Sequence, residues 1–186
     1  MYQVPDQSGR RILITGANSG TGREVAKRLS AAGADVIMAM RTPSKGESAR
    51  QDMLRSVPSA KLEVRTLDLA DLHSVRNLAH ALLDEGRPLD MLVNNAGVMT
   101  PPKRETTKDG FELQIGSNFL GPFALTNLLL PLLLKSRAPR VATMNGLRWF
   151  LIGDTHEASI PSTARTSDPV RLWSMTEAPT RTRVPA

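Results

Sequence analysis

The chain has 186 residues, of which 40% are hydrophobic and 23% are charged, a composition typical of a single globular domain. It contains no cysteine, which excludes disulfides, a thiolate nucleophile and a cysteine-ligated metal, and His73 and His80 have no third metal ligand nearby in the sequence. The net charge is +6, but the basic residues are scattered among acidic ones, so we expect no nucleic-acid partner.

Neither the beginning of the chain nor its interior predicts a membrane segment. Residues 1–9 are polar and lack the apolar run of a signal peptide. The longest apolar stretch, residues 119–134, is too short for a bilayer and is interrupted by Pro122 and Pro131. We therefore expect a cytoplasmic protein without a membrane partner.

Short apolar runs alternate with amphipathic helical patterns over the first 144 residues. The runs are continuous, which is typical of parallel strands buried on both faces. We predict strands at 11–15, 36–40, 62–67, 89–93 and 140–144, and helices at 20–32, 44–56, 71–85 and 111–136. This order predicts an α/β fold with a doubly wound parallel sheet, the Rossmann fold, built by right-handed crossovers.

Several helix ends are marked by single residues. Gly33 is placed to end the first helix, whereas Asp71 caps the third helix and Gly86 ends it. Pro122 and Pro131 conflict with the last helix, because each removes a backbone donor and should kink it.

A glycine-rich loop, Thr15–Gly22, joins the first predicted strand to the first predicted helix with the spacing G-x-x-x-G-x-G. Its glycines allow a sharp turn and let a pyrophosphate approach the backbone amides, and the helix N-terminus adds its positive dipole. A tight strand-to-helix turn uses the same residues, but the position in the first strand–helix unit favours phosphate binding. The candidate cofactor-binding residues are Gly16, Asn18, Ser19, Gly20, Thr21 and Gly22.

The end of the second strand indicates which cofactor is bound. An acidic residue there would bind the ribose 2′-hydroxyl of NAD(H), whereas a basic residue would bind the 2′-phosphate of NADP(H). Ala39-Met40-Arg41 contains no acid, Arg41 can hold a phosphate with two hydrogen bonds, and Lys45 lies one helical turn further. Arg41 could also be an ordinary solvated arginine, but the pattern favours NADP(H) over NAD(H).

Two further groups of residues follow predicted strands at the edge of the sheet where ligands bind. Asp68 and Leu69 follow the third strand, where the adenine edge of a dinucleotide would lie, although Asp68 could also cap a helix. Asn95-Ala96-Gly97 follows the fourth strand, where small residues would let the backbone contact the cofactor. Asn94 and Asn95 could instead only bridge neighbouring strands.

Thr15–Gly22 together with Asn94-Asn95-Ala96-Gly97 resembles the short-chain dehydrogenase/reductase family. Residues 40–47, 109–114 and 118–123 look like its retinol-dehydrogenase-like and protochlorophyllide-reductase-like branch, so the resemblance covers residues 10–144. It implies NADP(H)-linked reduction of a carbonyl or the reverse oxidation. It also places Asn118 at the family's catalytic asparagine, which holds a proton-relay water, whereas the residues alone would make Asn118 an ordinary polar helix residue.

The resemblance also identifies what this chain lacks. In the family a tyrosine exchanges a proton with the substrate oxygen, a lysine one helical turn later lowers the tyrosine pKa, and a serine orients the substrate. Here the one tyrosine is Tyr2, no lysine follows Lys135, and the fifth strand leads into Asn145-Gly146 in place of a serine pair. We therefore assign no catalytic Ser, Tyr or Lys, and we expect a catalytically impaired chain.

The chain is predicted to have two parts. Residues 1–144 form the NADP-binding Rossmann domain, and residues 145–186, rich in Pro, Ser and Thr, form a poorly ordered tail of out-of-frame or truncated sequence. The fold would then be incomplete after the fifth strand. We expect that strand to be an exposed sheet edge and the leucines between residues 125 and 134 to lose part of their cover.

The leading hypothesis is an NADP(H)-dependent oxidoreductase acting on a small-molecule carbonyl or alcohol that the sequence does not identify. The alternative is a non-catalytic nucleotide-binding or partner-binding module, which the missing tyrosine and lysine favour. A Rossmann-type methyltransferase fits less well, because Arg41 stands where the ribose of a methyl donor would need an acid. Members of the family that the chain resembles often associate through the long helix, so the sequence leaves open whether this chain forms a homo-oligomer.

Overall fold

A computed structural model describes residues 3–144 and contains one parallel sheet in the strand order β3-β2-β1-β4-β5. The strands are β1 (Arg11–Thr15), β2 (Asp35–Met40), β3 (Lys61–Thr66), β4 (Met91–Asn94) and β5 (Arg140–Thr143). All four strand pairings are parallel, with Ile12 of β1 paired to Val36 of β2 and to Met91 of β4. The predicted doubly wound sheet is thereby confirmed, while the predicted tail, residues 145–186, lies outside the described residues.

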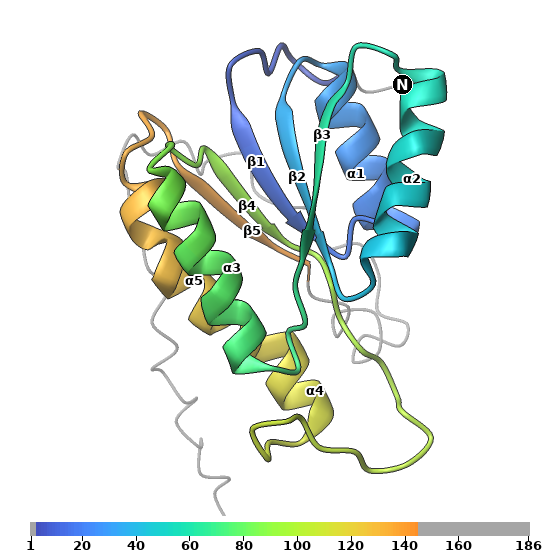
Figure 1. The fold of residues 1–186 in the computed structure, drawn as a ribbon, viewed down its shortest axis with the longest axis vertical. Coiled ribbons are helices and arrows are strands. Elements are labelled where there is room, and N and C mark those ends of the chain that lie inside the picture. Colours follow the sequence, from blue (N-terminus) through green and yellow to red (C-terminus); the bar gives the residue numbers. More distant parts are fainter. Residues whose placement is uncertain (1–2, 145–186) are drawn as a thin grey trace, which may run out of the picture. The chain divides into compact units, whose positions relative to one another are not determined.

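Helices cover both faces of the sheet, and Figure 1 shows α1 and α2 on one face and α3 and α5 on the other. The helical segments are α1 (Gly20–Ala31), α2 (Pro43–Ser56), α3 (Leu72–Glu85), α4 (Leu113–Ile115), the π-helical turn η1 (Gly116–Leu120) and α5 (Gly121–Leu133). Successive side chains of a strand point to opposite faces. Ile12 and Ile14 accordingly join the core under α1 and α2, whereas Leu13 joins the core under α3 and α5.

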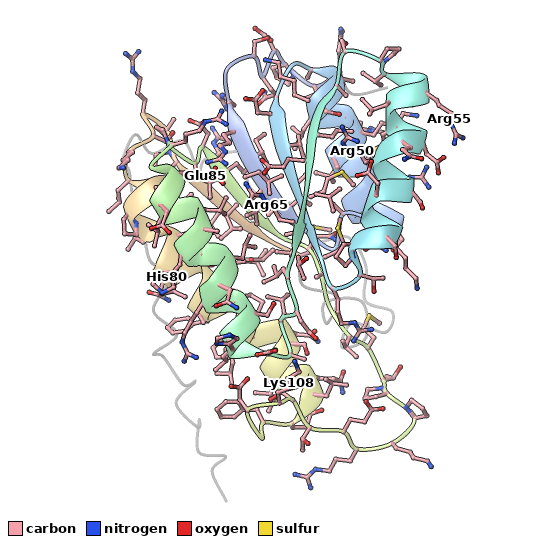
Figure 2. The ribbon with its side chains drawn as sticks, viewed as in Figure 1. Arg50, Arg55, Arg65, His80, Glu85 and Lys108 are labelled. Atoms are coloured by element: carbon pink, nitrogen blue, oxygen red, sulfur yellow. The ribbon has the colours of Figure 1, made fainter. Side chains whose placement is uncertain are left out.

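The edge strand β3 differs from the prediction of strands buried on both faces. Leu62 and Val64 pack toward the α1 and α2 side, but every residue of β3 is at least partly accessible. On the opposite face Arg65 forms ion pairs with Glu63 and with Glu85 at the end of α3. Figure 2 shows Arg65 and Glu85 near one another. The alternation of polar and apolar residues in β3 therefore matches a half-covered edge strand.

The predicted helix ends are confirmed. Asp71 caps α3 and accepts hydrogen bonds from the amides of His73 and Ser74. Gly86 ends α3 with φ +66°, and Gly33 follows α1 with φ +96°, so both adopt the left-handed conformation that favours glycine.

The predicted continuous helix at 111–136 is wrong in its details. The helical segment begins at Leu113, passes through the π turn η1 and ends at Leu133. Within the π turn the amide of Gly121 donates to the carbonyl of Gly116, five residues earlier. Pro122 has no amide to donate, so an α-helical bond to the carbonyl of Asn118 is impossible, and a wider turn just before Pro122 accommodates this loss.

The inner face of α5 is well covered, so the expectation that its leucines lose part of their cover holds only for the outer face of the helix. The leucines buried against α3 and the sheet are Leu125, Leu129, Leu132 and Leu133. Leu130 and Leu134 on the outer face are 44% and 67% exposed. The expectation that the fifth strand is an exposed sheet edge is confirmed within the described residues, because β5 lies at the edge of the sheet and all its residues are exposed.

The segment Leu113–Leu133 is the one helical stretch of the described residues with the length and apolar composition of a membrane span. A core helix of a globular domain satisfies the same criteria. Here the inner leucines of α5 pack against the sheet, as they would in such a core helix.

Candidate cofactor site

A cavity of about 750 Å³ lies at the carboxyl ends of the strands. The chain runs from β1 outward to β2 and β3 and then returns past β1 to β4. Parallel α/β sheets bind ligands at such a reversal of strand order. Ten of the residues predicted from the sequence line the cavity: Gly16, Asn18, Ser19, Thr21, Arg41, Asp68, Leu69, Asn95, Ala96 and Gly97. Gly20, Gly22 and Asn118 lie nearby in the chain but do not line it.

The three loop glycines meet three different requirements. Gly16 has φ +69°, and a Cβ added there would lie 3.0 Å from Ala96. Gly20 has φ +53°, but a Cβ there would meet no described atom within 4 Å. At Gly22 a Cβ would lie 2.5 Å from the carbonyl oxygen of Gly16 and even closer to the side-chain amide of Asn95. Gly16 and Gly22 therefore allow close packing within the loop, whereas Gly20 leaves its turn open to an approaching ligand.

Thr15 connects this loop to the end of β4 and is a residue that our sequence reasoning did not select. Its hydroxyl accepts hydrogen bonds from the amides of Asn95 (3.0 Å) and Ala96 (2.9 Å). In return the side-chain amide of Asn95 donates to the carbonyl of Thr15 at 2.9 Å. Asn95 thus bridges β4 and β1, which is the alternative role that the sequence left open. Any contact of Asn95 with a cofactor must therefore come from its backbone or from its side-chain oxygen. A threonine as the first residue of the glycine loop, directly before Gly16, is the signal that could have revealed this contact.

Arg41 lies directly after β2 on the cavity wall, and its side chain is exposed. Within residues 3–144 its guanidinium forms no ion pair. Arg23, by comparison, is paired with Asp52 at 3.2 Å. Lys45 is exposed in the first turn of α2 but does not line the cavity. An uncommitted guanidinium at this position is suited to bind a phosphate.

Asp68 forms a local turn and is not the cap of α3. One oxygen of its carboxylate accepts from the amide of Ala70 at 2.9 Å, and its own amide donates to the hydroxyl of Ser74. The cap is Asp71, so the second oxygen of Asp68 has no partner among the described residues. Leu69 beside it is buried and contributes an apolar wall.

Asn118 lies in the π turn, and its side chain binds the loop that follows β4. Its amide oxygen accepts from the backbone amide of Val98 at 2.7 Å, and its amide nitrogen donates to the carbonyl of Val98 at 2.8 Å. These two bonds hold residues 97–98 against η1. The side chain of Asn118 therefore positions the cavity wall, and its role toward a proton-relay water stays a prediction.

The loop between β4 and α4 is attached to the beginning of α3 by three polar contacts. Lys108 forms an ion pair with Asp71 at 2.6 Å, and its backbone amide donates to the carbonyl of Ala70. Asp109 accepts from the amide of Leu72 at 2.9 Å. The hydrogen bond between Lys108 and Asp71 lowers the pKa of the Asp71 carboxyl group and raises the pKa of the Lys108 ammonium group. Figure 2 shows Lys108 near the start of α3 and Glu85 at the opposite end of that helix.

Comparisons with known proteins agree with this geometry. A family model described as short chain dehydrogenase matches residues 10–147. Retinol dehydrogenase 13 from Homo sapiens is 42% identical over 139 residues, which cover 75% of this chain and 42% of that protein. Retinol dehydrogenase 12 from Mus musculus is 43% identical over 145 residues, which cover 78% of this chain and 45% of that protein. The chain thus spans less than half the length of these curated relatives.

Solved structures of short-chain dehydrogenases and of an uncharacterized protein also match the described fold. The Pseudomonas aeruginosa RhlG/NADP active-site complex aligns with a TM-score of 0.63 and 30% identity over 77% of this chain and 55% of that chain. An uncharacterized protein from Mycobacterium paratuberculosis aligns with a TM-score of 0.60 and 50% identity over 69% of this chain and 44% of that chain. From its glycine loop, its parallel sheet and these matches, the chain belongs to the short-chain dehydrogenase family of oxidoreductases.

Proposed function

We propose that this chain binds NADP(H), in preference to NAD(H), as the cofactor of a carbonyl reductase or alcohol dehydrogenase. The observation that carries the proposal is Arg41, an exposed guanidinium on the wall of the cavity that forms no ion pair with any residue between 3 and 144, directly after a strand whose end carries no acid. A guanidinium binds a 2′-phosphate through charge-assisted hydrogen bonds, whereas NAD(H) offers a neutral hydroxyl at that position. The RhlG complex, a relative bound to NADP, supports the same choice.

The loop residues supply the remaining contacts of the proposed site. The amide of Gly16 donates to the carbonyl of Ala39, so the amides that follow it in the loop and the N-terminus of α1 would bind the pyrophosphate. Ser19 makes no side-chain capping bond that would compete for these amides. The Asn95-Ala96-Gly97 backbone would contact the ribose and the nicotinamide half. Leu69 and the free carboxylate oxygen of Asp68 would border the adenine.

The substrate class follows from the family, and its chemical character follows from the relatives. We propose a small-molecule carbonyl or alcohol as substrate. Because the curated relatives are named retinol dehydrogenases, an apolar aldehyde such as retinal is the first substrate to test. Cytoplasmic location, the absence of a membrane or nucleic-acid partner, and a homo-oligomeric state stay predictions from the sequence.

We propose further that these 186 residues bind the cofactor but turn over substrate poorly. The family's proton transfer uses a tyrosine, and the only tyrosine of this sequence is Tyr2, ahead of the first strand. The same observation favours the second candidate, a nucleotide-binding or partner-binding module without chemistry of its own. The two candidates share the cofactor site and differ in whether hydride transfer occurs.

Titration of the full chain with NADPH and with NADH, followed by cofactor fluorescence, tests the proposal. We expect NADPH to bind more tightly, and Arg41→Ala to weaken NADPH by about 10- to 100-fold, because a hydrogen bond to a charged group contributes about 1.5–3 kcal/mol. NADH binding should change little. Arg55→Ala is the matched control, because Arg55 projects from the far end of α2 (Figure 2).

Two results would overturn the proposal in different ways. The preference for NADP(H) would be refuted if the wild-type chain bound NADPH and NADH with equal affinity. It would also be refuted if Arg41→Ala weakened the binding of NADPH and of NADH by the same factor. Rapid oxidation of NADPH with retinal would instead refute the proposed impairment, because another group would then supply the proton.

A further inference from the structure

One buried hydroxyl on the cavity wall lacks a hydrogen-bond partner. Among the described residues, three buried side-chain oxygens have none: one each in Asp35, Asn94 and Ser117. The Asp35 oxygen lies 3.4 Å from the ammonium group of Lys61, and Asn94 uses its amide nitrogen to bind Thr126 on α5. Ser117 is the only one of the three that lines the cavity.

The unpaired state of Ser117 is unusual for its surroundings. The residue is 4% exposed, and a buried hydroxyl without a partner destabilises a protein. A serine inside a helix ordinarily donates to a carbonyl one turn earlier, as Ser48 does to Ser44 at 3.1 Å. In the π turn Ser117 makes no such bond. A buried hydroxyl with no partner among the described residues is a candidate for a bond to a ligand.

The backbone around Ser117 is held firmly against the cavity wall. On one side, a Cβ at Gly121, the first residue of α5 directly after the turn, would lie 2.6 Å from the carbonyl of Leu69, so the junction of η1 and α5 packs on the residues that follow β3. On the other side, Asn118 binds the backbone of Val98. Ser117 is therefore held between the segments after β3 and β4. Because its hydroxyl oxygen is itself buried, a bond to a ligand requires rotation about χ1, which involves no backbone movement.

We propose that the Ser117 hydroxyl donates a hydrogen bond to the adenosine half of the bound cofactor. The inference rests on the proposed function, and it extends that function by naming a recognition residue. The packing of the junction of η1 and α5 on Leu69 favours the adenosine half, because the segment after β3 borders the adenine in the proposed site. Adenosine offers ring nitrogens and ribose oxygens as acceptors, whereas the pyrophosphate lies at the glycine loop on β1.

The experiment compares Ser117→Ala with Ser117→Thr, which keeps the hydroxyl, in the full chain. Ser30→Ala is the matched control, because Ser30 is also a buried helical serine, but its hydroxyl is satisfied by the carbonyl of Lys27. Dissociation constants are measured for NADPH, for adenosine 2′,5′-bisphosphate and for reduced nicotinamide mononucleotide. Melting temperatures are measured without any nucleotide.

If Ser117 binds adenosine, Ser117→Ala weakens NADPH and adenosine 2′,5′-bisphosphate by the same factor, about fivefold for one neutral hydrogen bond. Binding of the nicotinamide fragment is unchanged, Ser117→Thr retains most of the affinity, and Ser30→Ala leaves every dissociation constant unaltered. Without nucleotide, Ser117→Ala melts at or above the wild-type temperature, because it removes an unsatisfied group, whereas Ser30→Ala melts lower.

Unchanged affinity of Ser117→Ala for both adenosine ligands overturns this inference and leaves the proposed function intact. A fall in the melting temperature of nucleotide-free Ser117→Ala equal to that of Ser30→Ala also overturns it, because the hydroxyl would then be satisfied inside the protein by a buried water. A wild-type chain that binds neither NADPH nor adenosine 2′,5′-bisphosphate rejects the proposed function and this inference together.

Discussion

Substitution of Gly22 by alanine tests the close packing of the glycine loop. The new methyl carbon would lie 2.5 Å from the carbonyl oxygen of Gly16 and nearer still to the side-chain amide of Asn95. The first of these distances is about 1 Å shorter than an ordinary contact, and a backbone oxygen cannot rotate away. Overpacking of this kind costs about 1–3 kcal/mol, which for a chain of this length lowers the melting temperature by about 2 to 12 °C. We also expect NADPH affinity to fall, because the loop that faces the phosphates must shift.

A double-mutant cycle separates this clash from a general effect of alanine. Asn95→Ala removes one of the two clashing groups, so the cost of Gly22→Ala should be smaller in that background, although the clash with Gly16 persists. Gly20→Ala is the control. An alanine at the left-handed φ of +53° costs about 1–2 kcal/mol, but its Cβ would meet no described atom within 4 Å. The destabilisation by Gly20→Ala should therefore simply add to that by Asn95→Ala. Thermal denaturation gives the stabilities. Strict additivity of Gly22→Ala and Asn95→Ala would refute the packing.

Three further substitutions test other parts of the structure. Leu129→Ala should destabilise the domain by about 2–5 kcal/mol in urea unfolding, since Leu129 is fully buried under α3; a loss below 1 kcal/mol would mean that α5 does not pack there. Thr15→Val leaves the amide of Ala96 unpaired and removes one of the two acceptors of the Asn95 amide, and it should cost about 1–3 kcal/mol, whereas Thr15→Ser should be tolerated; equal losses would reject the hydroxyl contacts. Asp71→Asn should lower the melting temperature at pH 7 by weakening the contact with Lys108. Because folding lowers the pKa of Asp71, the stabilisation by its carboxylate is complete above the ordinary value of 3.8. It is lost as the pH falls from 3.8 through the lower pKa of the folded state, and the difference between the variant and the wild type should vanish below that lower pKa.

The sequence predicts the fold of residues 3–144 well, because its signals are local. Continuous apolar runs mark the central strands, and Asp71 and Gly86 mark the ends of α3 through a cap and a left-handed residue that depend on neighbouring backbone alone. The π turn could not be predicted in this way. Pro122 signals a break, but whether the helix kinks, ends or widens depends on the packing of Gly121 against Leu69, which is distant in the sequence.

The candidate site was predicted in its members but not in their roles. Ten of the predicted residues line one cavity, because loops that follow parallel strands meet at one edge of the sheet. The polar side chains at that edge, however, are largely engaged with the protein itself. Asn95 binds Thr15, and Asn118 binds Val98. Residue type and spacing do not distinguish an amide that binds a ligand from one that binds the backbone.

These internal bonds explain why motifs far apart in the sequence belong together. Gly22 lacks a side chain so that Asn95 can reach the start of the glycine loop, and Thr15 receives the amides that follow β4. Asn118 then fixes the next part of that segment and places Ser117 on the same cavity wall. A change at any of these positions is therefore expected to disturb the others. Among residues 3–144, the guanidinium of Arg41 and the hydroxyl of Ser117 have no such internal bond, which is why the proposals assign them to the ligand.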